Sequence, residues 1–212
     1  MKQLYLDYAI KVLQQGGIVA YPTDTAYGLA ADATNDSAVK KLYKLKGRAF
    51  KKPIHVIAEV KDLKKIVEVN AVANKLIKKF WPGPLTIVLP LKAKGRSWQL
   101  LSAKTGTMGI RWPNNKLALS LVKNFGKPIT TTSANIAGLG DCFSVAEVQS
   151  QFRKSKLKPD FYLDGGNLKH GKPSTVVLTT KNHVKMLRQG PITEKQIKNV
   201  FGKKNKLLFS RT

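Results

Sequence analysis

The sequence predicts a single α/β domain with a mixed sheet flanked by helices. Short apolar segments typical of buried strands alternate along the chain with segments whose apolar residues recur every three or four positions, as in helices. The chain has 212 residues, of which 42% are hydrophobic, enough to bury one sizeable core. No repeat, low-complexity linker or compositional break divides it. We therefore expect one domain over residues 1–202, followed by a basic C-terminal tail over 203–212.

The elements of the first half of the chain are predicted from the spacing of apolar residues and from the residues that cap or end each element. Leu6, Ile10 and Leu13 fall on one face of an opening helix, which the glycines at 16 and 17 end. Asp36 is a suitable N-cap for a second helix, and Gly47 is a suitable residue to end it. The other expected elements are strands over 18–21, 54–60 and 85–91, helices over 62–69 and 71–80, and a proline-containing break at 81–84.

The second half continues the alternation. Its expected elements are a loop over 92–106, a strand over 107–112, a helix over 116–125, a strand over 128–132, a short helix ending near 152, strands over 161–164, 174–180 and 183–188, and a last helix. Ser144 with Glu147, and Thr193 with Gln196, have the spacing of a capping box at a helix start. Helix–strand alternation favours parallel pairs, whereas the short connection between the last two strands favours an antiparallel hairpin. Together they predict a mixed sheet.

The charge of the chain is its most unusual bulk property. Lys and Arg number 38 against 12 Asp and Glu, which gives a formal net charge of +26. Such a field attracts polyanions, so nucleic acid, nucleotides or an anionic membrane surface are natural partners. A lysine-rich surface that is only solvated explains the same excess equally well. The charge alone does not decide between the two.

Absent motifs argue against several classes of protein. Cys142 is the only cysteine, so no intramolecular disulfide can form, and a reducing, cytoplasmic compartment fits best. We expect neither a signal peptide nor a membrane span, because the longest apolar runs are far below the roughly 20 residues that cross a bilayer. The sequence lacks GxxxxGK[ST], GxGxxG after a strand, HExxH and CxxC, so a P-loop NTPase, a dinucleotide oxidoreductase and a zinc hydrolase are unsupported.

Polar clusters lie at three predicted strand ends, where an open α/β sheet binds ligands. They cover residues 21–33, 42–56 and 130–138, and each is also readable as a turn whose side chains bond to their own backbone. Arginine separates the two interpretations, because a planar fork grips a carboxylate or phosphate at two points as lysine cannot. Only six of the 38 basic residues are Arg, and three of them, Arg48, Arg111 and Arg188, lie at predicted loops or strand ends.

Seven segments carry a resemblance to a known family. In chain order they are YPTDTAYGLAADA, LKGRAFKKP, WPGPLTIVLP, TMGIRWP, PITTTSANIAG, GKPSTVV and MLRQGPIT. Their order and spacing resemble the YrdC/TsaC family of threonylcarbamoyl-AMP synthases over residues 5–192. The resemblance implies a twisted mixed sheet flanked by helices, with a basic central cavity. It also implies an enzyme that makes threonylcarbamoyl-adenylate and pyrophosphate from L-threonine, bicarbonate and ATP, for threonylcarbamoyladenosine modification of tRNA next to the anticodon.

The resemblance also implies roles for individual residues. The matched positions that handle the ATP phosphates, and with them the chemistry, are Lys46, Arg48, Ser133 and Asn135. Further nucleotide-side positions are Lys52, Thr107, Asp141 and Arg188, and threonine-side positions are Thr25, Arg111, Thr131 and Ser174. Mg²⁺ is expected to accompany ATP through its phosphates, without a dedicated protein metal site. Expected partners are the proteins that transfer the threonylcarbamoyl group to tRNA, and tRNA or other RNA.

The sequence departs from the family pattern at three points, and two other functions are alternatives to the synthase. Ala49 stands where the family commonly has Pro. Ile57 stands where many members have a His near threonine, and His55 lies two residues earlier on the same strand face, where we expect a packed or solvent-facing role. The chain is similar to the short bacterial form, so we expect no second domain over the cavity. The alternatives are a non-catalytic RNA-binding or ribosome-assembly factor, which the charge favours, and a relative that transfers carbamoyl from carbamoyl phosphate.

Overall fold

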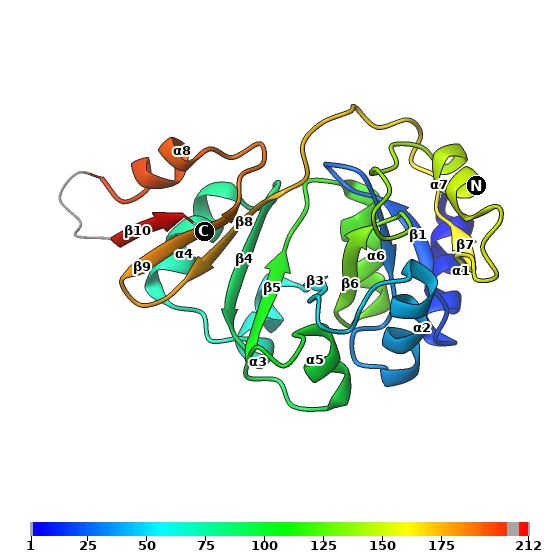
Figure 1. Cartoon of the computed structure of the whole chain (residues 1–212), viewed down its shortest axis with the longest axis horizontal. Helices are drawn as coiled ribbons and strands as arrows, with labels where there is room; N and C mark the ends of the chain where they lie inside the picture. The colour runs from blue at the N-terminus through cyan, green and yellow to red at the C-terminus, as the bar shows by residue number, and fades with distance from the viewer. Residues whose placement is uncertain (1, 203–207, 212) are drawn as a thin grey trace.

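The computed structural model describes residues 2–202 and 208–211, and within them ten strands form one mixed sheet. The strand order is β10-β9-β8-β4-β5-β3-β6-β2-β1-β7 (Figure 1). The strands are β1 (Val19–Pro22), β2 (Tyr27–Ala30), β3 (His55–Ile57), β4 (Leu85–Pro90), β5 (Thr107–Arg111), β6 (Ile129–Ser133), β7 (Phe161–Tyr162), β8 (Thr175–Thr179), β9 (His183–Arg188) and β10 (Leu208–Arg211). The predicted mixed sheet is confirmed.

Both kinds of strand pairing occur along the sheet. Pairs β1–β2, β2–β6, β3–β6, β4–β5 and β8–β9 are antiparallel, and pairs β1–β7, β3–β5, β4–β8 and β9–β10 are parallel. The predicted hairpin is therefore confirmed as β8–β9. The short strand β3 lies at the centre and joins β5 to β6. Its neighbours come from more than 50 residues later in the chain, so the middle of the sheet depends on long-range contacts.

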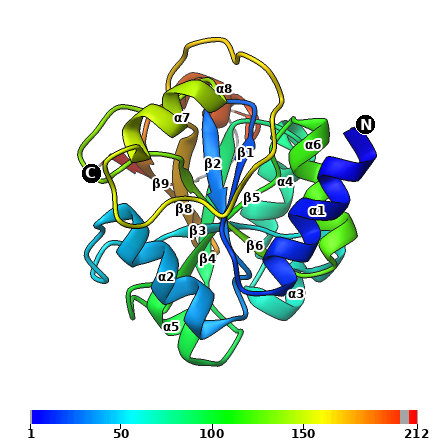
Figure 2. The same ribbon diagram turned by 90° about the vertical axis from the view of Figure 1, so that its right-hand side faces the viewer.

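Helices cover both faces of the sheet. They are α1 (Lys2–Gln14), α2 (Asp36–Lys46), the 3₁₀ turn η1 (Val60–Asp62), α3 (Leu63–Ile66), α4 (Ala71–Phe80), α5 (Arg96–Leu101), α6 (Lys116–Phe125), α7 (Val145–Phe152) and α8 (Glu194–Asn199). Figure 2 shows α1 beside α6 on one side, with α2 and α5 on the other. One buried apolar cluster packs α1 and α6 against the sheet, and a larger one includes residues of α2, α3, α4, α5, α7 and α8.

Helix α2 illustrates how local sequence sets an element and its end. Asn35, not the expected Asp36, is the N-cap: its side chain accepts hydrogen bonds from the backbone N–H groups of Ser37 and Ala38. The prediction of Asp36 was wrong because the preceding residue already has the extended backbone of a cap and a suitable oxygen. Gly47 ends the helix as predicted, with a left-handed φ of 59° that favours glycine.

Several predicted elements differ from the structure in extent. Strand β3 and helix α3 are shorter than predicted, because Val60 begins a 3₁₀ turn and Val67 bridges to Leu91. The sequence analysis missed β2, α5 and β10. Ser144 caps α7 as expected, but Glu147 accepts from Phe143 N–H, so the capping box there is only half formed. Of the predicted tail, residues 203–207 and 212 lie outside the described residues, and 208–211 form β10.

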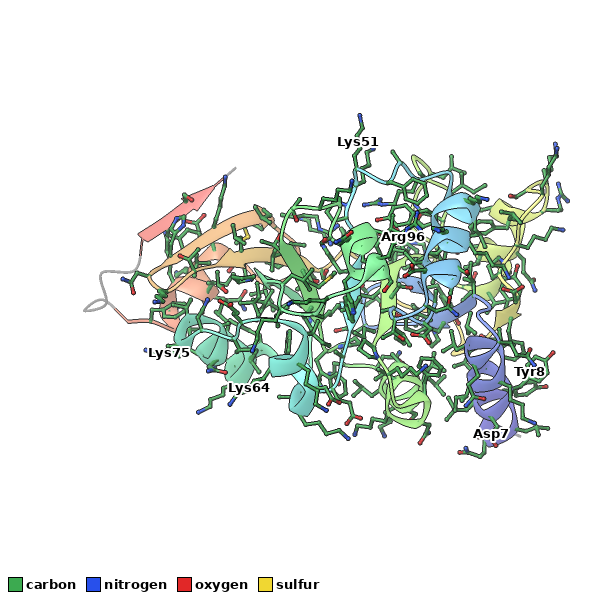
Figure 3. The ribbon with its side chains drawn as sticks, turned by 90° about the horizontal axis from the view of Figure 1, so that it is seen from below. Asp7, Tyr8, Lys51, Lys64, Lys75 and Arg96 are labelled. Atoms are coloured by element: carbon green, nitrogen blue, oxygen red, sulfur yellow. The ribbon has the colours of Figure 1, made fainter. Side chains whose placement is uncertain are left out.

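The surplus lysines lie at separate places on the surface. Lys51, Lys64 and Lys75 point outward from the loop after α2, from α3 and from α4 (Figure 3). This spread is typical of solvated lysines, so the net charge does not by itself locate a binding surface. None of the described helices combines the length and apolarity that crossing a bilayer requires.

Candidate active site

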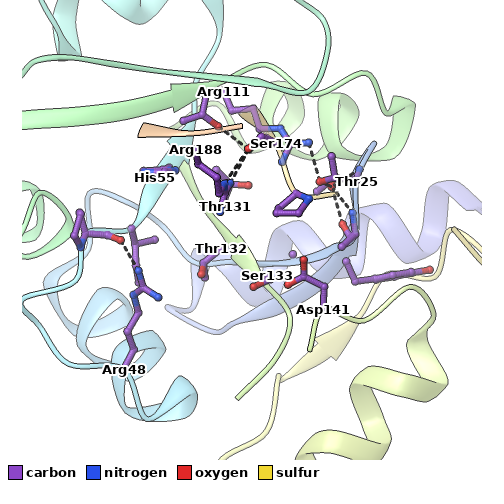
Figure 4. Close-up of a pocket in the computed structure, with 18 residues that line it drawn as sticks. Thr25, Arg48, His55, Arg111, Thr131, Thr132, Ser133, Asp141, Ser174 and Arg188 are labelled. Atoms are coloured by element: carbon purple, nitrogen blue, oxygen red, sulfur yellow. Dashed lines mark hydrogen bonds between the residues drawn. The ribbon is translucent and has the colours of Figure 1, made fainter. Parts of the chain in front are cut away.

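A polar cavity of about 210 Å³ lies over the central strands β3, β5 and β6 (Figure 4). Its wall is built from segments far apart in the chain: the turn between β1 and β2, the loop after α2, the loop after β6, the start of β8 and the end of β9. Eight of the twelve residues that the resemblance implies line it, namely Thr25, Arg48, Arg111, Thr131, Ser133, Asp141, Ser174 and Arg188. The fold thus gathers three of the six arginines around one cavity.

Arg111 ends β5 and forms the most enclosed corner of the cavity. Its Nη2 atom donates to an Asp24 carboxylate oxygen and, at 3.0 Å, to Thr25 Oγ1. The two ion-paired side chains are only 7% and 10% exposed, and Asp24 also accepts from the backbone N–H of Asn114. The buried Nε of Arg111 has no hydrogen-bond partner among the described residues. The protein thus leaves one donor of this charged fork unpaired, and the residue as a whole lines the cavity.

Arg188 and Ser174 form a second corner where β8 begins and β9 ends. Arg188 Nε donates to the Ser174 carbonyl at 3.0 Å, and Nη2 lies 3.1 Å from Ser174 Oγ. That hydroxyl also lies 3.0 Å from Thr86 Oγ1 on β4. Partial burial, with the like charge of Arg111 second, lowers the pKa of Arg188. Burial and the neighbouring Arg111 charge both make the charged form of Arg188 less favourable. A bound anion would offset this penalty, so the corner is suited to an anionic ligand.

Lys46 lies behind the cavity wall instead of on it. It is the last residue of α2 and only 1% exposed, and its Nζ donates to the carbonyls of Ser133 and Asn135 and to Asn135 Oδ1. Asn135 Oδ1 also accepts from Ser133 Oγ at 2.8 Å. Burial, followed by the nearby Arg48 charge, lowers the pKa of Lys46 to about 7. The three bonds of this ammonium hold the turn that presents Ser133 to the cavity.

Arg48 is fixed by the loop that follows α2. Its Nε and Nη2 donate to the carbonyls of Lys52 and Pro53, at 3.2 and 2.9 Å. Tyr43 supports the same loop, because its hydroxyl donates to the Lys52 carbonyl and to the Leu100 carbonyl, each at 3.0 Å. Partial burial lowers the pKa of Arg48. The Lys52 carbonyl therefore positions Arg48, whereas the Lys52 side chain is exposed.

Two other implied residues also lie off the cavity wall. Asn135 is buried in the turn that Lys46 holds. Thr107 begins β5, at the opposite end of that strand from Arg111, and its hydroxyl lies 3.0 Å from Thr105 Oγ1.

His55 lines the cavity, although the sequence analysis expected a packed or solvent-facing role for it. It begins β3, and its half-buried imidazole lies between Arg48 and Arg188 (Figure 4). Burial, then the charges of Arg188, Arg48 and Arg111, lowers its pKa to about 4, so this imidazole is neutral near pH 7. The position of His55 on β3 could have indicated this place, because the strands on both sides of β3 contribute residues to the cavity wall.

Asp24 was also read differently from the sequence. It stands in the turn between β1 and β2, for which one of the two sequence-based interpretations was a turn whose side chains bond to their own backbone. It bonds instead to Arg111, 87 residues away, a contact that no local pattern reveals.

Comparison with known proteins assigns the chain to a family. The family model Sua5_yciO_yrdC, described as telomere recombination, matches residues 11–190. The chain belongs to the Sua5/YciO/YrdC family. The family resemblance seen in the sequence is thereby confirmed.

Individual relatives agree with this assignment. The threonylcarbamoyl-AMP synthase of Bacillus subtilis (strain 168) is 37% identical over 196 residues, which are 92% of this chain and 56% of that protein. The crystal structure of Pyrococcus abyssi Sua5 complexed with L-threonine matches with a TM-score of 0.87 and 32% identity, over 96% of this chain and 58% of that one. Escherichia coli YciO matches with a TM-score of 0.80 and 26% identity, over 93% and 94%. The chain thus spans little more than half of the Bacillus and Pyrococcus proteins.

Proposed function

We propose that the protein is an L-threonylcarbamoyladenylate synthase, which makes threonylcarbamoyl-AMP and pyrophosphate from L-threonine, bicarbonate and ATP. The observation that carries the proposal is the grouping of Arg48, Arg111 and Arg188 around one cavity with serine and threonine hydroxyls. This set of donors suits a substrate pair that brings a carboxylate and a triphosphate together. The family assignment and the threonine complex of the Pyrococcus relative support the same reading.

Threonine is proposed to bind at the Arg111 corner. The Arg111 guanidinium lines the cavity and suits the amino-acid carboxylate, and the pair with Asp24 holds it in place. Thr25, Thr131 and Ser174 are hydroxyl-bearing residues of the same cavity wall, suited to the carboxylate oxygens and to the threonine hydroxyl. Such a site discriminates against amino acids that lack a hydroxyl, because its own polar groups are then left unpaired.

The triphosphate is proposed to bind at Arg48, Ser133 and Arg188. These residues line the cavity and supply two guanidiniums and a hydroxyl. Lys46 and Asn135 are proposed to act indirectly, by holding the turn that carries Ser133. Asp141 also lines the cavity, and we assign it to the nucleotide side. Lys52 and Thr107 stay predictions for contacts with the nucleotide.

The proposed reaction has two steps with balanced bonds. The threonine amine attacks the carbon of bicarbonate, water leaves, and a carbamate forms. A carbamate oxygen then attacks the α-phosphorus of ATP, and the bond to the β,γ-pyrophosphate breaks. Negative charge moves onto pyrophosphate, so cations fixed beforehand at that end stabilise the transition state without a covalent intermediate on the protein.

Magnesium is proposed to enter with ATP. Among the residues that the structure describes, no three His, Cys, Asp or Glu side chains gather as a metal site, and Asp141 is the one acid on the cavity wall. The phosphate oxygens therefore suit Mg²⁺ better than this chain's own donors do, as is common for nucleotide-bound magnesium. When bound, Mg²⁺ would offset phosphate charge.

The wider role is proposed from the relatives. The product is an activated mixed anhydride, so a protein that transfers the threonylcarbamoyl group to the tRNA base next to the anticodon must consume it. Direct contact with tRNA or other RNA, and a cytoplasmic location, are proposals that the net charge of +26 and the single cysteine support.

Pyrophosphate release by the purified protein tests the function. We expect release from ATP only when L-threonine and bicarbonate are both present, together with detection of the adenylate by mass spectrometry. Pyrophosphate release that does not depend on L-threonine or bicarbonate overturns the proposal. Absence of release, combined with tight and salt-sensitive RNA binding, would favour the RNA-binding alternative.

Arg48→Ala tests the triphosphate side of the site. We expect turnover to fall about 100-fold, because one pre-aimed donor of a developing charge is lost. Arg96→Ala is the matched control, since Arg96 is exposed on α5 and is not part of the cavity wall. Equal turnover of Arg48→Ala and the parent protein would contradict this placement of the triphosphate.

A further inference from the structure

The His55 ring has a fixed place on the cavity wall. The backbone of His55 pairs with Thr131 of β6, and the imidazole packs against Gly109 of β5. A Cβ atom built at Gly109 would lie 2.4 Å from His55 Cδ2, so any larger residue there would displace the imidazole. The glycine thus provides the space that the ring occupies. A side chain held in this way is pre-organised toward whatever the cavity binds.

Both nitrogens of that ring are unused. Neither makes a hydrogen bond to any residue that the structure describes, whereas the three neighbouring guanidiniums bond to carbonyls, hydroxyls or a carboxylate. A packed structural histidine normally satisfies at least one ring nitrogen. The unsatisfied imidazole faces a cavity, so its partner is expected to come from a bound molecule.

Positive charges outnumber negative charges around His55. Three guanidiniums approach from three elements: Arg48 after α2, Arg111 on β5 and Arg188 on β9. Asp24 is already paired with Arg111, and Asp141 is the acid of the cavity wall. The surplus positive charge, together with burial, keeps the pKa of His55 near 4 in the ligand-free protein.

A polyphosphate would reverse this situation. It brings several negative charges among the same three guanidiniums, which removes the main repulsion on an imidazolium and adds a direct attraction. The ring then gains a second N–H donor, and a charge-assisted hydrogen bond to a phosphate oxygen becomes available. By linkage, proton uptake and polyphosphate affinity must strengthen each other.

We propose that His55 is a ligand-binding residue that takes up a proton when a polyphosphate enters the cavity and then donates a hydrogen bond to it. His55 is thereby a fourth cation of the site that is charged only while the ligand is present. This inference rests on the proposed function in taking the triphosphate end of ATP as the ligand. It adds a residue and a pH dependence that the family resemblance does not assign.

Proton uptake on binding of inorganic pyrophosphate tests the proposal. Calorimetric titrations at pH 5, between the pKa of about 4 in the ligand-free protein and the raised value expected with ligand, are run in two buffers of different ionisation enthalpy. They give the protons taken up per bound pyrophosphate. We expect the parent to take up more protons than His55→Gln, and subtracting the two removes the protonation of pyrophosphate itself. His170→Gln is the matched control, because His170 is exposed and stacks on Phe143 outside the cavity wall. Equal uptake by the parent and His55→Gln overturns the proposal.

A second measurement keeps the test decisive if His55→Gln does not bind pyrophosphate. The Cε1 proton of His55, assigned by its absence from the variant spectrum, is followed by NMR against pH in the parent. With saturating pyrophosphate its titration should move upward by at least one pH unit, and affinity should rise up to about tenfold per pH unit of acidification between the two pKa values. An unchanged titration overturns the proposal. Neither measurement uses threonine or bicarbonate, so a failure to form the adenylate is distinguishable from a failure of this inference.

Discussion

Two buried cations, Arg111 and Lys46, support the cavity in different ways. Arg111 is paired with a carboxylate, keeps one donor unused and lines the cavity. Lys46 gives all its bonds to neutral oxygens of Ser133 and Asn135, and lies behind the wall. The carboxylate compensates the buried charge of Arg111, whereas burial lowers the pKa of Lys46 to about 7.

This difference indicates a division of labour. A cation that has a counter-charge and a spare donor can hold its own position and still bind a ligand. A cation whose donors are all occupied by backbone and amide oxygens acts mainly by fixing those oxygens in place. We therefore expect Arg111 variants to lose threonine binding directly, and Lys46 variants to lose triphosphate binding through movement of the Ser133 turn.

The largest effect is expected from Arg111→Met. It leaves the Asp24 carboxylate buried without its partner, so the free energy of unfolding should fall by about 3–5 kcal/mol, and adenylate formation should be lost. Urea unfolding and pyrophosphate release measure the two. The double variant Arg111→Met/Asp24→Asn should recover most of the stability and none of the activity. Recovery of activity in the double variant would remove Arg111 from the threonine site.

A smaller effect is expected from Lys46→Met, which keeps the length of the side chain and removes its donors. Three oxygens lose their partner, so the free energy of unfolding should fall by about 1–3 kcal/mol. Turnover should fall with it, because Ser133 is no longer held. Lys51→Met is the control, since Lys51 is exposed. An unchanged urea midpoint for Lys46→Met would contradict the positioning role.

The pH dependence of stability sharpens the contrast. The pKa of Lys46 is about 7 in the folded chain against 10.5 for an unperturbed lysine, so between these values the unfolded state binds more protons. Stability should therefore rise with pH from about 7 toward 10, by at most about 1.4 kcal/mol per pH unit. The parent measured against Lys46→Met at pH 7, 8 and 9 isolates this contribution. A constant difference over that range would show that the Lys46 ammonium is not destabilised by burial.

The smallest effect is expected from Asp141→Ser. Asp141 lines the cavity and makes no hydrogen bond to any described residue, so its loss should scarcely change stability. Removing a half-exposed negative charge beside a triphosphate site should tighten ATP binding only a few-fold, because solvent screens much of the repulsion between the carboxylate and the phosphates. The KM for ATP measures this. A KM that rises tenfold or more would instead make Asp141 a necessary contact to the nucleotide.

How much the sequence could predict depends on the range of the interactions involved. Helices α4 and α6 begin and end where predicted, because an apolar stripe and local capping residues define them. Strand β2 was missed because its four residues follow a polar turn and resemble its continuation, and β10 becomes a strand only by pairing with β9. The family resemblance named eight of the eighteen residues of the cavity wall. The Asp24–Arg111 pair and the place of His55 depend on strand neighbours that no local pattern encodes.

The order of the strands has a consequence for synthesis of the chain. The cavity needs Thr25 from the first turn, His55 from β3 and Arg188 from the end of β9, so it is complete only after residue 188 has left the ribosome. Because β3 must wait for β5 and β6, the centre of the sheet closes through distant contacts, which fold slowly. A nascent chain truncated before β9 should therefore be able to form the β1–β2 hairpin and α2 while still lacking a ligand site.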